Sequence, residues 1–292
     1  MERPNQKQSA SVKSREERIL DKLPLFSSTE LVLVKKDLHA IWRRKGIRAL
    51  LMAMPAVLVM VIPIVYSALI SLLPVTESSP PEVLSALLSA ETAGHGYRQF
   101  WMDAFATLLC PMLFICVPIV CSIGAAACVF VSEKEDHTLE TLILTPIGAR
   151  SVFNAKIIVC FLVSVGISAI SFFVFAITMS VADIVISAPY FFSLEWLVTL
   201  FLLMPAVTLF SVVFVTISMP RVHGVGESLQ TMGYVILPFA AMYLVQFTGA
   251  YRINVGFLLM VVIILFLAAI ILFNVSSRRF QADLLLSRSK MT

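Results

Sequence analysis

The hydrophobic residues of this chain are gathered into six long stretches that contain no charged residue and are separated by polar segments. The stretches cover residues 49–76, 104–132, 157–182, 196–220, 228–250 and 254–277. A helix needs about 20 apolar residues to cross a bilayer, and an ionised side chain at its centre costs at least about 2.5 kcal/mol. The pattern therefore predicts an all-α membrane protein in which residues 49–277 form a domain of six transmembrane helices.

A helical period also precedes the first stretch. Apolar residues recur there mostly at steps of three and four, at Leu31, Val34, Leu38, Ile41 and Trp42. These steps place the side chains on one face of a helix, so we expect residues 28–48 to form an amphipathic interface helix along the inner membrane surface. Residues 1–27 are polar and carry both signs of charge, which predicts a cytoplasmic arm, and residues 278–292 predict a short cytoplasmic tail.

Composition supports a membrane protein and argues against a water-soluble one. Hydrophobic residues make up 59% of the chain and charged residues 14%, whereas soluble domains average about 45–50% and about 25%. Too few charges remain to cover a soluble core of this size. All five cysteines lie within predicted spans, and their spacing is not typical of a disulfide framework or a zinc site.

The distribution of lysine and arginine predicts the orientation of the spans. Twelve of the 22 precede residue 49, and alternating crossings place eight more on the same side, so that only Arg98 and Arg252 fall on the other. Positive residues concentrate in cytoplasmic segments, which predicts a multi-pass protein of the cell membrane with both termini in the cytoplasm. The basic side then faces anionic membrane lipid, and no nucleic-acid partner is needed to explain its charge.

The segment between the second and third stretches contains start and stop signals for a short helix. Ser132 and Glu135 match a capping box, and Pro146 ends the pattern. Leu139 and Leu142 share one side of this helix, so an apolar ridge flanked by charges would be available to a soluble partner. On the residues alone, a solvated charged connection between two spans remains an equal alternative.

This segment resembles the hallmark of type 2 ABC exporter permeases, a group that includes sodium-efflux and drug- or peptide-export permeases. The residues that carry the resemblance are Glu133, Lys134, Glu135, Thr138, Leu139, Glu140, Leu142, Thr145 and Pro146. The resemblance implies that they form a coupling helix, which docks into a groove of a cytoplasmic ATPase subunit. It also implies that two copies of this chain, or this chain and a sister permease, act together.

The function implied by the resemblance is that of the permease subunit of an ATP-driven exporter. Such a chain would couple ATP hydrolysis on a separate subunit to movement of a substrate across the membrane. The chain contains no Gly-x-x-x-x-Gly-Lys-Ser/Thr phosphate-binding loop. We therefore expect ATP and Mg²⁺ to be bound by the partner ATPase, and this chain to have no catalytic site, metal site or cofactor of its own.

Three other functions are compatible with a six-span protein. An ion-coupled secondary transporter usually has ionisable groups in mid-membrane, whereas here they lie at the edges of the spans, as Asp103, Asp183 and Glu195 do. An intramembrane enzyme is disfavoured because no His-Glu-x-x-His or Gly-x-Ser-x-Gly motif occurs. A membrane protein with a structural or immunity role and no transport activity stays open.

Overall fold

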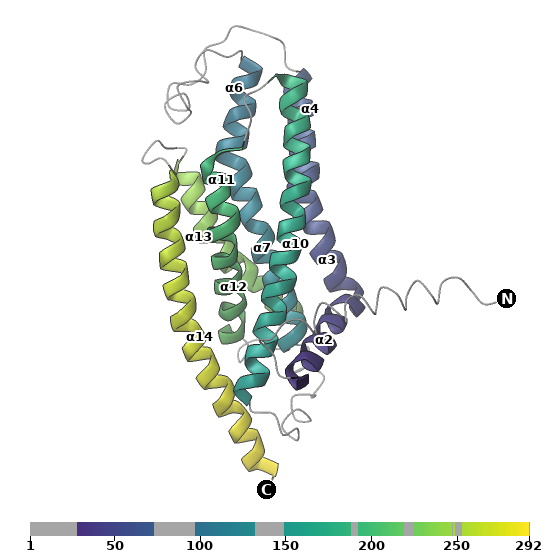
Figure 1. Cartoon of the computed structure of the whole chain (residues 1–292), viewed down its shortest axis with the longest axis vertical. Coiled ribbons are helices and arrows are strands. Elements are labelled where there is room, and N and C mark those ends of the chain that lie inside the picture. Colours follow the sequence, from purple (N-terminus) through teal and green to yellow (C-terminus); the bar gives the residue numbers. More distant parts are fainter. Residues whose placement is uncertain are drawn as a thin grey trace, which may run out of the picture.

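The computed structural model describes residues 28–72, 97–131, 149–187, 192–218, 225–246, 248 and 253–291. Within these ranges every regular element is helical (Figure 1). The helices are α2 (Ser28–Arg43), α3 (Lys45–Ala56), η1 (Val57–Val61), α4 (Ile62–Leu72), α6 (Tyr97–Ala104), η3 (Phe105–Leu109), α7 (Cys110–Ala126), η4 (Ala127–Val131), α10 (Ala149–Ile186), α11 (Leu194–Val198), η5 (Thr199–Leu203), α12 (Met204–Ser218), α13 (Val225–Gln246) and α14 (Val255–Met291). The elements named η are turns of π-helix that continue the α-helices on either side.

The predicted all-α fold with six spans is confirmed for the part of the chain that the structure describes. Six continuous helices there are long and apolar enough to cross a membrane: Lys45–Leu72, Tyr97–Val131, Arg150–Ile186, Leu194–Ser218, Gly226–Gln246 and Val255–Arg278. Helix α14 continues past the last of these spans into residues predicted as a separate tail. Its 37 residues measure about 55 Å, and its C-terminal end projects beyond the other helices (Figure 1).

The second span lies at the centre of the bundle. Of the 18 most apolar consecutive residues of this span, 94% are buried inside the protein, whereas the share is 22% for the first span and for the last. Helix α7, which forms its middle part, packs against α3, α10, α12 and α13. The outward faces of the surrounding helices are apolar as well, and on α10 they expose Ile170, Phe173 and Ile177. Such faces would be unfavourable in water, and a bilayer covers them.

Helix α2 packs on the bundle at the end where α14 also ends (Figure 1). It stops before Arg44, whose extended backbone, with φ −77° and ψ 106°, separates it from α3. Val34 and Ile41 of the predicted apolar face are buried, and α2 contacts α10 and η4. Much of that face therefore faces protein. A position along the inner membrane surface stays a prediction, and the predicted arm, residues 1–27, lies outside the described residues.

Prolines account for three of the four π-turns in the described ranges. The residue two places after the turn is proline in each: Pro63 after η1, Pro111 after η3 and Pro205 after η5. A helical proline donates no backbone hydrogen bond, and its ring clashes with the carbonyl four residues earlier. That carbonyl belongs to the middle residue of the turn each time. A wider π-turn relieves the clash at these three places, whereas Pro118 and Pro238 lie inside α7 and α13 without a π-turn.

At the end opposite α2, three helices are joined by hydrogen bonds. The Tyr66 hydroxyl donates to the Trp101 carbonyl at 3.1 Å, which links α4 to α6. Gln99 Nε2 donates to the Ser187 carbonyl at 2.8 Å, and Ser187, directly after α10, has a positive φ of 57°. A left-handed residue at this position commonly ends a helix. Here it directs its carbonyl toward α6.

The close packing of the first and second spans depends on a small residue, as the run of glycine and alanine at 124–127 predicts. A Cβ atom added at Gly124 of α7 would lie 3.3 Å from Leu50 Cδ2 of α3. An added Cβ at Gly166, on the exposed side of α10, would meet nothing within 4 Å. The two glycines therefore provide a matched pair of substitution sites.

We expect Gly124→Leu to destabilise the solubilised protein by about 1–3 kcal/mol, the usual cost of overpacking a core. Gly166→Leu should be neutral or slightly stabilising, because leucine has the better helix propensity and its side chain points to open space. Thermal unfolding in detergent measures both. Equal melting temperatures for the two variants would show that α3 and α7 are not in close contact.

Candidate functional site

The nine residues predicted to couple this chain to an ATPase all lie outside the described residues. They belong to residues 132–148, and the structure describes the helices on either side of them. Helix η4 ends at Val131 and α10 begins at Ala149. The described residues next to these two helix ends form what we call the junction. It consists of η4, residues 150–156 of α10 and residues 34–41 of α2.

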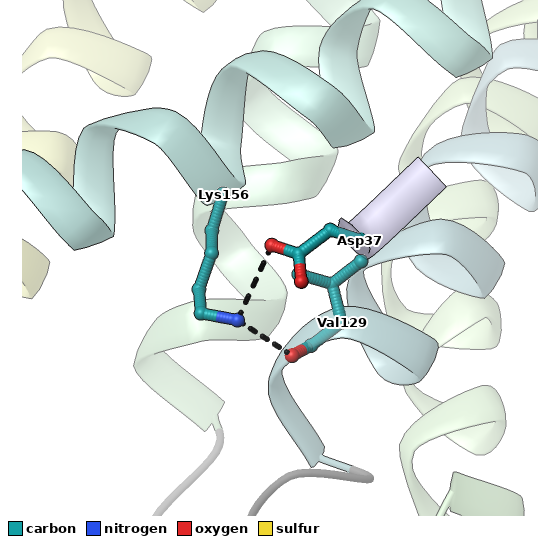
Figure 2. Close-up of polar contacts among 3 residues, drawn as sticks. All are labelled: Asp37, Val129 and Lys156. Atoms are coloured by element: carbon teal, nitrogen blue, oxygen red, sulfur yellow. Dashed lines mark hydrogen bonds and ion pairs between the residues drawn. The ribbon is translucent and has the colours of Figure 1, made fainter. Parts of the chain in front are cut away.

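A buried lysine lies at the centre of the junction. Lys156 Nζ is 3.4 Å from Asp37 Oδ2 and donates to the Val129 carbonyl at 3.3 Å. Figure 2 shows the ammonium between these two acceptors, one on α2 and one on η4. It also lies 5.8 Å from the centre of the Phe130 ring, within the range of a cation–π contact. One ammonium group thus contacts two consecutive residues of η4 and one residue of α2.

This arrangement constrains how α2, η4 and α10 lie relative to one another more than it stabilises the fold. The side chains of Lys156 and Asp37 are 0% and 3% exposed, and removing two charges from water costs about as much as their attraction returns. Both contacts are also longer than the about 2.7–2.9 Å that is usual for charge-assisted hydrogen bonds. Separating the partners would nevertheless leave a charge buried in apolar surroundings. The three helices are therefore expected to move together or to exchange partners together.

Aromatic packing connects the junction to the last span. The rings of Phe130 and Phe153 are 6.0 Å apart, and those of Phe153 and Phe273 are 5.8 Å apart. This row runs from η4 through α10 to α14. The junction therefore packs, through Phe153, against the last helix of the bundle.

Polar groups inside the bundle are mostly satisfied within their own helices. Hydroxyl groups bond to carbonyls three or four residues earlier at Ser122, Ser164, Ser171, Thr208 and Ser211. A contact between helices occurs where the Thr216 and Ser276 oxygens are 2.7 Å apart. In the described ranges the buried lysine, arginine, aspartate and glutamate residues are Asp37, Lys156 and Asp183. Asp183 lies near the far end of α10, so none of the three is in mid-span.

The contribution of Asp37 and Lys156 was missed by the sequence analysis. Asp37 lies three residues after Val34 and four before Ile41, so a carboxylate interrupts the apolar face of the helix. That placement is a usable signal, because a buried carboxylate needs a donor. Lys156, one residue before a charge-free stretch, counted only as a cytoplasmic positive charge. Nothing in the sequence pairs the two, which are 119 residues apart.

Comparison with known proteins gives one match. The family described as ABC-2 family transporter protein matches residues 42–237, about two thirds of the chain. No curated protein and no solved structure matched. The matched range includes residues 132–148, the helices that flank them and Lys156, whereas Asp37 precedes it.

Proposed function

Because the chain belongs to the ABC-2 transporter family, we propose that it is the permease subunit of an exporter powered by a separate ATPase. Family membership makes it a multi-pass membrane component of an ABC transporter. The single observation that supports the finer proposal is that the range matched by the family, residues 42–237, includes residues 132–148 and both flanking helices. Those residues contain the pattern that resembles a coupling helix.

In this proposal the ATPase docks on residues 133–146 through the ridge that contains Leu139 and Leu142. Glu133, Glu140 and their neighbours supply the charged margin of the contact. The segment directly follows the second span, whose central position means that a push on it reaches every helix packed against α7. Movement of the ATPase would thereby change how the spans pack and open a path for the substrate.

The remaining parts of the assembly follow from this proposal. ATP and Mg²⁺ bind on the ATPase subunit, and a second copy of this chain or a sister permease completes the transporter. Both termini lie in the cytoplasm, on the side of the ATPase, and the protein resides in the cell membrane. The ends of α2 and α14 lie at one end of the bundle (Figure 1), which agrees with this orientation.

Co-purification with an ABC ATPase encoded beside the chain tests the proposal. We expect the wild-type chain to retain the ATPase and Leu142→Asp to retain at least about tenfold less, because removal of a buried apolar anchor costs about 2 kcal/mol or more. Glu140→Lys should weaken retention as well. Leu72→Asp is a matched control at the exposed end of α4, where 81% of Leu72 is accessible. Wild-type retention by both segment variants would contradict the docking role.

A further inference from the structure

The fourth π-turn of the described ranges, η4, has no proline to explain it. Two residues after its last residue, Val131, the sequence has Glu133, whereas η1, η3 and η5 each have a proline at that place. The local covalent structure therefore permits an ordinary α-helix at 127–131. A contact from another helix is therefore the candidate cause of the wider turn.

The contact of Lys156 occurs at the position where the prolines act in the other turns. A proline ring displaces the carbonyl four residues earlier, which belongs to Val59, Thr107 or Phe201, the middle residue of each turn. The middle residue of η4 is Val129, and its carbonyl is the one that accepts from Lys156 at 3.3 Å. A side chain inserted into the ladder of backbone hydrogen bonds distorts a helix in the same way. The ammonium thus acts through a hydrogen bond on the same carbonyl that a proline ring displaces in the other three turns.

The two causes differ in reversibility. A proline lacks its backbone donor in every state of the protein, whereas a hydrogen bond from Lys156 can be made and broken. Each residue of an α-helix adds about 100° of rotation and about 1.5 Å of rise. Conversion of η4 between the π and α forms would therefore turn the chain that follows it by about one residue's rotation.

We propose that η4 is a reversible hinge and that Lys156 is the positioning residue that couples its state to the position of α2. The ammonium holds the Val129 carbonyl of η4 and the Asp37 carboxylate of α2 simultaneously (Figure 2). When η4 changes form, the Lys156 ammonium changes its acceptors and α2 shifts against α10. The inference rests on the proposed function for the force that moves η4, whereas the contacts of Lys156 do not depend on it.

Hydrogen–deuterium exchange of the complex with its ATPase tests the coupling. Exchange is measured at residues 127–131 and 33–43, with and without Mg²⁺ and the β,γ-imido analogue of ATP. In the wild-type complex we expect the nucleotide to change exchange in both regions, by about tenfold, within the range typical of coupled sites. In the double variant Lys156→Met with Asp37→Leu, which leaves no buried charge from the pair and no donor to the Val129 carbonyl, the responses of both η4 and α2 should vanish.

Lys156→Arg is the conservative control, because a guanidinium still donates to both acceptors, and it should keep the response of α2. A double variant that keeps the nucleotide response of α2, or a wild-type η4 that does not respond, would overturn the proposal. The chain without its ATPase provides an independent readout. There the double variant should exchange the amides of η4 about tenfold faster or slower than wild type, and unchanged exchange would overturn the proposal even if the ATPase assignment failed.

Discussion

Replacement of Lys156 alone by methionine should lower the stability of the solubilised chain by about 3–5 kcal/mol. The reason is that the Asp37 carboxylate, 2% exposed, would lose the ammonium that it faces in a buried site, and removing one partner of a buried pair has this cost. Asp37→Leu alone should have a similar effect, because it leaves the Lys156 ammonium with one acceptor fewer. Thermal or denaturant unfolding in detergent measures both changes.

The double variant distinguishes a coupled pair from two independent sites. Replacing both Lys156 and Asp37 by apolar residues of similar volume removes the buried charges together, so most of the lost stability should return. Lys45→Met, on the exposed surface at the start of α3, should stay within about 0.5 kcal/mol of wild type. A double variant whose loss equals the sum of the two single losses would show that the ion pair does not join α2 to α10.

Thiol labelling from outside the cell should give an all-or-none result for the two ends of the bundle. A cysteine placed at Ser85, between the first two spans, should react with a membrane-impermeant reagent in intact cells. A cysteine at Ser289 should react only after the membrane is opened. The difference follows from the 20 lysine and arginine residues that the sequence places on the side of the termini.

The five native cysteines determine the background labelling in this measurement. Cys110, Cys121, Cys128 and Cys160 are buried and Cys116 is half-buried, all within membrane-spanning helices, so the unmodified protein should label weakly. Rapid labelling of Ser289→Cys in intact cells would place the C-terminus outside. The positive charges would then face the wrong side of the membrane, and a cytoplasmic ATPase could not reach residues 133–146.

The six spans could be predicted from the sequence because a long charge-free run is a local property of the chain. A charge-free run of sufficient length can only cross a bilayer or be buried. The π-turns are less predictable, because Pro63, Pro111 and Pro205 follow one, whereas Pro118 and Pro238 lie in regular α-helix. The central position of the second span in the bundle could not be predicted from the sequence. A bilayer and a protein interior both favour apolar residues, so the mean hydropathy of the second span, 2.6, is below the 3.3 of the peripheral sixth span.

The junction was harder to predict because it depends on residues distant in sequence. Asp37 within an apolar helical face indicates a buried partner, yet 22 lysine and arginine residues were possible partners. Only the packing of α2 on α10 selects Lys156. The π-turn at η4 was equally hard to predict, since the side chain that contacts its middle carbonyl lies 27 residues further along the chain. The ATPase-coupling residues themselves, 133–146, stay a prediction.

The most direct test of the ATPase-docking proposal is a photocross-link from the segment between the second and third spans. A photoreactive amino acid at Leu142 in the assembled transporter should form an adduct with the ATPase subunit on illumination, and the same residue at Leu72 should form none. Adduct formation from Leu142 is the result that docking on this segment predicts. An intact complex that yields no adduct from Leu139 or Leu142 would contradict it.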